Sequence, residues 1–200
     1  MKVIKVICTL FIFGFVSVSH AAVIFITEKD ANGTVTSLLG ADNVEVNGLF
    51  YNVRFLDGTC IALFNDCDDR TDFVFNTVDT ATAASEALLA QVFVSGIKGD
   101  FDATPWLTNG CSGNNDCIVA TPFREEGQGA FHYIGAVNGV NDVDDSVYVT
   151  SWDVDGDYAD FDNRTFAVWG EAVDASAPGT AMILLMGIAG LLVSQRRKQA

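Results

Sequence analysis

Residues 44–55 read Val-Glu-Val-Asn-Gly-Leu-Phe-Tyr-Asn-Val-Arg-Phe, and they contain the clearest local signal in the chain. Two runs of alternating apolar and polar residues are joined by Asn47-Gly48, a dipeptide that favours a two-residue type I′ turn because both turn residues need positive φ. Such a turn pairs Val46 with Leu49 and Val44 with Tyr51. We therefore expect a β-hairpin with one row of core-facing side chains: Val44, Val46, Leu49, Tyr51, Val53 and Phe55.

Further strand patterns lie on both sides of this hairpin, at residues 23–27, 118–120, 131–137, 147–152 and 165–169. An Ala-rich stretch repeats apolar residues at the spacing of one helix face, and Asp79 or Thr80 can cap its N-terminus. The repeating residues are Ala81, Ala84, Leu88 and Val92. We expect this helix to end near Gly96 and a polar loop to follow over residues 98–117. The fold class is then α+β or β-rich, a mostly antiparallel sheet or sandwich with one packed helix.

The first 21 residues have the order of a secretory signal peptide. Lys2 and Lys5 precede an apolar run, and the segment ends in small residues. We expect a signal helix that is removed by cleavage between Ala21 and Ala22. The apolar run is well short of the roughly 20 residues that a membrane span needs, which disfavours an uncleaved anchor.

Residues 175–200 combine a small-residue motif, an apolar stretch and a basic cluster. The apolar stretch, residues 181–193, predicts a transmembrane helix, and basic residues directly after it stay on the cytoplasmic side, so the body lies outside. A buried core helix is the alternative because the stretch is short for a bilayer, but such a helix would not finish in a basic cluster. The motif and the cluster consist of Ser176, Ala177, Pro178, Gly179, Thr180, Arg196, Arg197 and Lys198.

These tail residues resemble the PEP-CTERM sorting signal of Gram-negative bacteria over roughly residues 175–198. Ser176 and Ala177 stand where Pro and Glu are usual and Pro178 keeps its place, so the tail is a Ser-Ala-Pro-Gly-Thr variant. The resemblance implies an exosortase-type processing enzyme as a partner, and membrane contact through the C-terminal helix before processing. It also implies delivery to the cell surface or extracellular matrix, with the tail either cleaved or kept as an inner-membrane anchor. Residues 44–75 resemble a recurring group of small exported PEP-CTERM proteins, a likeness that implies no activity.

Between the two end segments lies a body of residues 22–174, enough for one domain. Five of the chain's 11 basic residues and none of its 26 acidic residues lie in the end segments, so the body has six basic and 26 acidic residues, a net charge of −20. Such a surface repels phosphate backbones, which excludes nucleic acid as a partner, and it attracts divalent cations.

The four cysteines of the body fall into two close pairs. In an oxidising compartment an even number of cysteines predicts disulfides, and four allow three connectivities. The sequence-local one, Cys60 to Cys67 and Cys111 to Cys117, needs the least chain reorganisation. A zinc site is the alternative, but the six and five intervening residues are more than the usual two to four.

The most pointed candidate site is an acidic loop between two aromatic strands. Alternate carboxylates can converge on one Ca²⁺ ion, although Tyr158 and Arg164 stand where an EF-hand needs Gly and Glu. Two interpretations remain: a looser calcium loop, with Asp142, Asp144 and Asp145 nearby, or a solvated acidic loop. Its carboxylates are Asp153, Asp155, Asp157, Asp160 and Asp162.

Signatures of catalysis are scarce. His132 is the only histidine of the body, and the Gly-x-Ser-x-Gly, P-loop and dinucleotide motifs are missing from the sequence. Trp106, Trp152 and Trp169 form either a sugar-stacking platform or part of a second buried face. We predict a non-enzymatic exported protein of the surface or matrix that interacts with extracellular polysaccharide. The alternatives are a Ca²⁺-dependent carbohydrate-binding module and a small secreted hydrolase.

Overall fold

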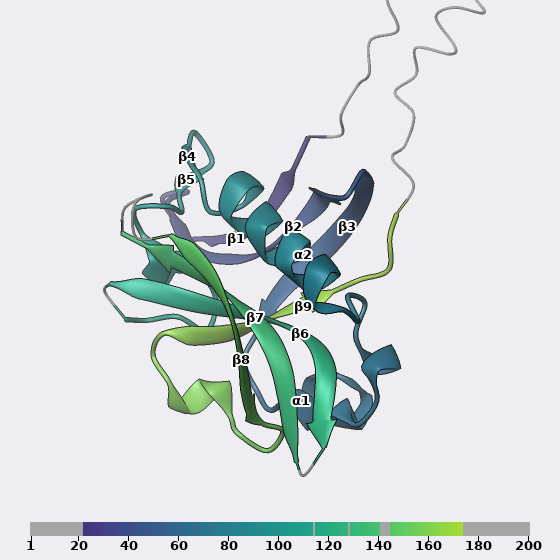
Figure 1. Ribbon diagram of the computed structural model, residues 1–200. Helices are drawn as coiled ribbons and strands as arrows, with labels where there is room; N and C mark the ends of the chain where they lie inside the picture. Colours follow the sequence, from purple (N-terminus) through teal and green to yellow (C-terminus); the bar gives the residue numbers. More distant parts are fainter. Residues whose placement is uncertain (1–21, 114, 128, 141–144, 174–200) are drawn as a thin grey trace, which may run out of the picture. The chain divides into compact units, whose positions relative to one another are not determined.

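A computed structural model describes residues 22–113, 115–127, 129–140 and 145–173, which belong to one compact unit (Figure 1). Within these ranges no helix is long and apolar enough to cross a membrane. The predicted signal helix, sorting motif and C-terminal helix fall outside the described residues. The elements are β1 (Ile24–Lys29), β2 (Val35–Val46), β3 (Leu49–Leu56), α1 (Cys60–Leu63), η1 (Asn65–Cys67), η2 (Arg70–Asp72), α2 (Val78–Gln91), β4 (Ser95–Gly96), β5 (Gly99–Asp100), η3 (Pro105–Leu107), β6 (Asp116–Gly127), β7 (Ala130–Gly139), β8 (Ser146–Asp153), η5 (Tyr158–Asp160) and β9 (Arg164–Trp169).

Seven strands form one mixed sheet in the order β1-β2-β3-β9-β6-β7-β8. Neighbouring strands are antiparallel except β6 and β9, which are parallel. The expectation of a β-rich, mostly antiparallel fold with one packed helix is confirmed. The sandwich alternative is wrong, because the described strands other than the short β4–β5 hairpin all join a single sheet.

The predicted hairpin is β2–β3, and its register is the expected one. Val46 pairs with Leu49 and Val44 with Tyr51, and Asn47 and Gly48 have φ of 52° and 81°. Most of the predicted row is buried, but Leu49 is 53 % exposed because it lies beside the turn at the end of the hairpin. The strand before the turn is longer than expected, since β2 begins at Val35.

The helix α2 carries three residues of the predicted stripe, and the fourth, Val92, follows directly as its C-cap. All four are fully buried. Its cap differs from the prediction: the Thr77 hydroxyl accepts a hydrogen bond from the Thr80 backbone N–H, so the helix begins before Asp79. The helix ends at Gln91, and the backbone N–H groups of Val92 and Phe93 both donate to the Leu88 carbonyl. Thus the sequence located the buried face correctly and missed both ends by a few residues.

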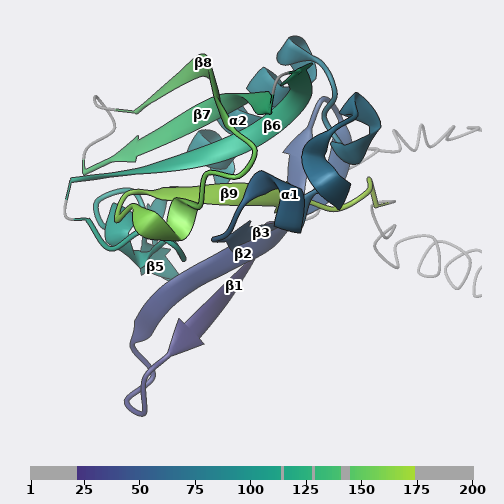
Figure 2. The same ribbon diagram turned by 90° about the horizontal axis from the view of Figure 1, so that it is seen from below.

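The two faces of the sheet are covered by different parts of the chain. On the side that we call the helix face, α2 packs against β2, β6, β7 and β8 (Figure 1). The opposite side, the loop face, is covered by residues 60–73, which contain α1, and by the connection that contains η5 (Figure 2). Buried residues at the loop face form their own cluster: Cys60, Phe64, Cys67, Phe73, Ala120, Phe131, Tyr133, Tyr158 and Phe166.

Candidate functional site

We located the candidate site from the positions of the six basic residues of the body. Positive charges are rare in this body, which has 26 acidic residues. Arg54 pairs with Asp42, with a distance of 2.8 Å between Nη1 and the carboxylate oxygen. The Arg164 guanidinium lies 5.1 Å from the centre of the Trp152 ring. The other four basic residues fall into two pairs, and each pair lines a hollow on the protein surface.

The first hollow, which we call the basic pocket, has a volume of about 410 Å³. Its charged groups are the exposed side chains of Arg70 and Arg124, beside the half-buried His132. None of the described side chains that line it is acidic. The described residues that line it are Arg70, Asn76, Thr77, Val78, Phe123, Arg124, His132 and Val149. In a body of net charge −20, two arginines at one hollow give it local electrostatics that favour an anion.

A β-bulge places two neighbouring residues of β6 at this pocket. Pro122 pairs with Tyr133 and Arg124 pairs with His132, so Phe123 is an extra residue without a partner in the register. Adjacent residues of a regular strand point to opposite faces, but the bulge lets both Phe123 and Arg124 line the pocket. The His132 ring stacks against the Phe123 ring with 5.9 Å between centroids.

Another wall of the basic pocket is the N-terminus of α2, where Thr77 and Val78 line the hollow. The positive end of the helix dipole lies here and favours a negative ligand by a few tenths of a kcal/mol. Val78 and Val149 are 45 % and 57 % exposed. The pocket therefore offers cationic groups for a carboxylate, an amide group for hydrogen bonds, and an apolar wall for C–H groups.

The loop face holds a second polar cluster, an aromatic cage around Arg164. The guanidinium lies over the rings of Trp152 and Phe161 and donates a hydrogen bond of 3.3 Å to the Tyr133 hydroxyl. Burial, with the neighbouring Tyr133, raises the pKa of Tyr148 to about 12 and also raises the pKa of Tyr158. Tyr158 is fully buried and stacks on Phe166 at 4.2 Å. The cage thus joins the buried rings of Tyr133 and Tyr158 to the partly exposed Trp152 and Phe161, at the border of the loop-face core.

The tryptophan platform is not formed by the predicted residues. Trp169 is only 7 % exposed and packs on Phe75 and Tyr51 in the helix-face core. Trp152 belongs to the loop-face cluster, as the alternation along β8 predicts, and Trp106 is exposed. Trp169 and Trp152 lie on opposite faces of the sheet, so the buried interpretation holds for Trp169, whereas Trp152 is only partly buried.

The five aspartates of the acidic loop do not converge on one point. Asp157 caps η5 by accepting a hydrogen bond from the Ala159 backbone N–H at 2.9 Å, and Asp153 and Asp155 are exposed. Asp160 and Asp162 line a separate hollow with Asp57, whose pKa is raised by burial and by the charge of Asp157. Across the part of the chain that the structure describes, no three acidic, histidine or cysteine side chains are grouped to hold a metal ion.

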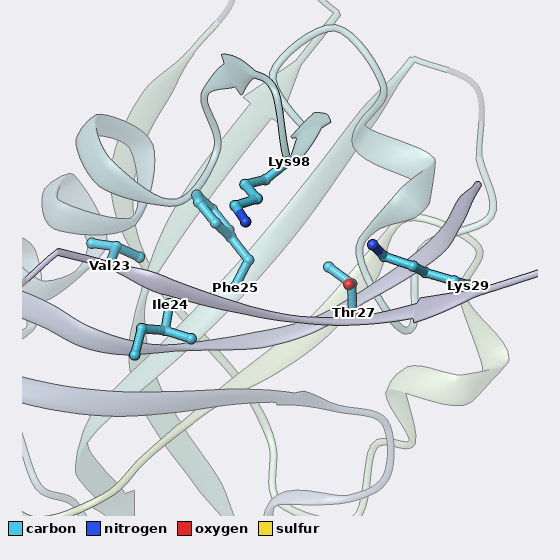
Figure 3. A pocket seen from close by; sticks show the side chains of 6 residues that line it. All are labelled: Val23, Ile24, Phe25, Thr27, Lys29 and Lys98. Carbon is cyan, nitrogen blue, oxygen red and sulfur yellow. The ribbon is translucent and has the colours of Figure 1, made fainter. Parts of the chain in front are cut away.

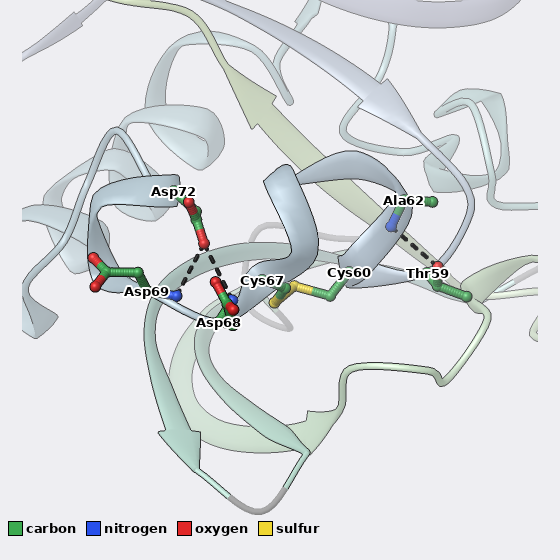
Figure 4. The surroundings of a disulfide bond; sticks show 7 residues. All are labelled: Thr59, Cys60, Ala62, Cys67, Asp68, Asp69 and Asp72. Carbon is green, nitrogen blue, oxygen red and sulfur yellow. Dashed lines mark hydrogen bonds between the residues drawn. A yellow bond between two sulfur atoms is a disulfide. The ribbon is translucent and has the colours of Figure 1, made fainter.

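Both cysteine pairs form disulfides with the sequence-local connectivity, Cys60 to Cys67 and Cys111 to Cys117. The first bond holds an unusual backbone, since Asn65, Asp66 and Cys67 all have positive φ. Figure 4 shows its surroundings, where the Asp72 carboxylate accepts hydrogen bonds from the backbone N–H groups of Asp68 and Asp69. Asp69 and Asp72 thus act as local caps.

No family model, curated protein or solved structure matches the chain. The basic pocket is the part of the site that sequence reasoning missed. Arg70 and Arg124 are 54 positions apart in the chain, and only the low number of basic residues in the body hinted that their positions matter.

Proposed function

We propose that the protein is a non-enzymatic, exported binding protein of the cell surface or extracellular matrix, and that its basic pocket holds a carboxylated polysaccharide. The gathering of Arg70, Arg124 and His132 at one hollow of a strongly acidic body carries the proposal. Two disulfides in the body agree with an exported protein. Sorting through the PEP-CTERM-like tail, with an exosortase-type partner, belongs to the same proposal.

A uronic acid fits this pocket because its chemistry matches all three kinds of lining group. A planar guanidinium pairs with a carboxylate through two parallel N–H donors. The Asn76 amide supplies a partner for sugar hydroxyls, and Val78 and Val149 offer apolar surface to the C–H face of the ring. An inorganic anion would use the first feature alone, so the apolar wall favours a carboxylated sugar.

The net charge of the body does not prevent this binding at physiological salt. The Debye length is about 8 Å at 0.15 M ionic strength, so acids far from the pocket are screened while Arg124 and Arg70 act at contact distance. At about 0.01 M the length rises to roughly 30 Å and the whole acidic body repels the polymer. The affinity for a polyuronate should therefore rise as the ionic strength is raised from about 0.01 M to 0.15 M. A protein with a basic surface should show the opposite change.

The test is calorimetric titration of the exported protein, with its disulfides intact, using a short oligogalacturonate. Arg124→Gln should weaken binding about tenfold, the effect of losing roughly 1.4 kcal/mol. Arg54→Gln is the matched control, because it removes the same charge from a residue that pairs with Asp42 outside the pocket. Equal losses in the two variants, or equal binding of the methyl-esterified oligosaccharide, would contradict the proposal. Binding that disappears in EDTA would indicate a calcium-dependent module instead.

A further inference from the structure

The remaining two basic residues of the body line a second hollow, which we call the lysine groove. Lys29 lies at the end of β1 and Lys98 in the turn between β4 and β5, and they are the only lysines of the body. Figure 3 shows both side chains at a hollow of about 280 Å³, with Thr27 between them and the Phe25 ring beside Lys98. The Phe25 ring packs against Phe101 at 5.4 Å, which fixes the apolar floor.

The two lysines line more than one hollow. They also line an adjoining space of about 490 Å³ along the β4–β5 hairpin, where Ile97 is fully exposed. One acid, Asp100, lies in that lining, and its carboxylate accepts a hydrogen bond from the Ser95 hydroxyl. Among the residues that the structure describes, neither lysine forms an ion pair. The ammonium groups thus stand exposed between two hollows, over apolar surface.

The basic pocket and the lysine groove lie at opposite ends of α2. Thr77 and Val78, at the helix N-terminus, line the basic pocket, whereas Lys98 follows the helix C-terminus by seven residues. The 14-residue helix is about 21 Å long, well beyond the roughly 8 Å Debye length at physiological salt. The two sites therefore attract anions independently.

The charges on α2 decide whether one polymer chain serves both sites. The helix has only two charged residues, Asp79 and Glu86, and both are acidic and exposed. An anionic chain that ran from one site to the other along the helix would pass these carboxylates and be repelled. Separate chains at the two ends avoid that repulsion.

From this arrangement we infer that the domain is bivalent: the lysine groove holds a second carboxylated polysaccharide chain, so that one protein cross-links two chains. This inference rests on the proposed function of the basic pocket. The occupant is anionic because the only two lysines of the body are exposed at this hollow, and a carboxylated polysaccharide is the anionic ligand that the proposed function already supplies. Flexible lysine stems also accept carboxylates in varied positions along a polymer.

The number of ligands bound per protein tests directly whether the domain is bivalent. Calorimetric titration with a short oligogalacturonate should give two ligands per protein, and one ligand for the variant with both Lys29→Gln and Lys98→Gln. Arg124→Gln should leave one tight ligand, at the lysine groove, with binding at the basic pocket about tenfold weaker, while Arg54→Gln keeps two tight ligands. With long polygalacturonate, the native protein should raise viscosity by cross-linking, and either one-site variant should lose that rise.

The outcomes separate the two proposals. One ligand per native protein, lost in Arg124→Gln, leaves the basic pocket standing and overturns the lysine groove. The absence of any binding overturns the proposed function itself. Self-association in sedimentation without polymer, lost in the lysine double variant, would assign the groove to a second copy and overturn the inference. If the double variant unfolds at a lower temperature than the native protein, the stoichiometry is measured with the single variant Lys98→Gln. This substitution should not disturb the fold, because Lys98 lies in an exposed turn.

Discussion

The two faces of the sheet are closed in different ways. On the helix face, one regular helix presents small and aliphatic residues to the strands, with Ala81, Ala84 and Leu88 all buried. On the loop face, irregular segments present rings and a disulfide, and Tyr158 stacks on Phe166. The difference teaches that periodic packing can be read from a sequence, whereas packing by irregular segments depends on contacts between residues far apart in the chain.

The largest expected effect comes from removing one large side chain from each face. Phe166→Ala should lower the free energy of unfolding by about 3–5 kcal/mol and Leu88→Ala by about 2–5 kcal/mol, because both side chains are fully buried. Urea unfolding, followed by circular dichroism and by tryptophan fluorescence, measures both changes. Coincident transitions would mean that the faces unfold together. Separate transitions in either variant would contradict a single cooperative body.

A smaller effect should distinguish the two disulfides. Replacing Cys60 and Cys67 by Ala should cost about 2 kcal/mol by the loop-entropy estimate, and it also frees the positive-φ backbone of residues 65–67. The matched variant replaces Cys111 and Cys117. The native disulfide between these two residues closes a loop of similar length. Chemical unfolding should show the larger or equal loss for the first pair. A clearly larger loss for the second pair would mean that the loop face depends little on its disulfide.

The smallest effect at neutral pH concerns the aromatic cage. Burial raises the pKa of Tyr148 to about 12, above its unfolded value of about 10. Its neutral form is therefore favoured in the folded protein. The contribution is fully present below pH 10 and is lost as the pH rises towards 12. Tyr148→Phe should leave stability at pH 7 nearly unchanged and should reduce the loss between pH 10 and 12. An unchanged alkaline profile in this variant would place the sensitivity elsewhere.

The sequence predicted the helix face well and the loop face poorly. The Asn47-Gly48 turn and the stripe of α2 follow from local propensity and spacing, and both are present. The packing of Tyr158 on Phe166 has no such periodicity. For Trp169 the sequence left two interpretations open, a sugar-stacking platform and a buried face, and the buried one is correct. Strand alternation predicts which side of the sheet a residue faces, but it does not predict what covers that side.

The candidate site was hidden from the sequence for a related reason. Its key residues come from η2, β6 and β7, and the bulge at Phe123 shifts the register so that Arg124 lies opposite His132. A bulge leaves little trace in hydrophobic alternation. Pro122 is a hint, since proline inside a sheet favours edges and bulges. By contrast, the acidic loop stands out in the sequence, yet its carboxylates are dispersed in the fold.

The measurement that tests the central claim most directly is a backbone amide NMR titration of the exported protein with a short oligogalacturonate at physiological salt. The basic pocket predicts saturable shifts at Val78, Arg124 and His132, which the methyl-esterified oligosaccharide does not produce. Shifts confined to other parts of the domain, or equal shifts with the esterified form, would contradict a carboxylate-binding pocket at this site.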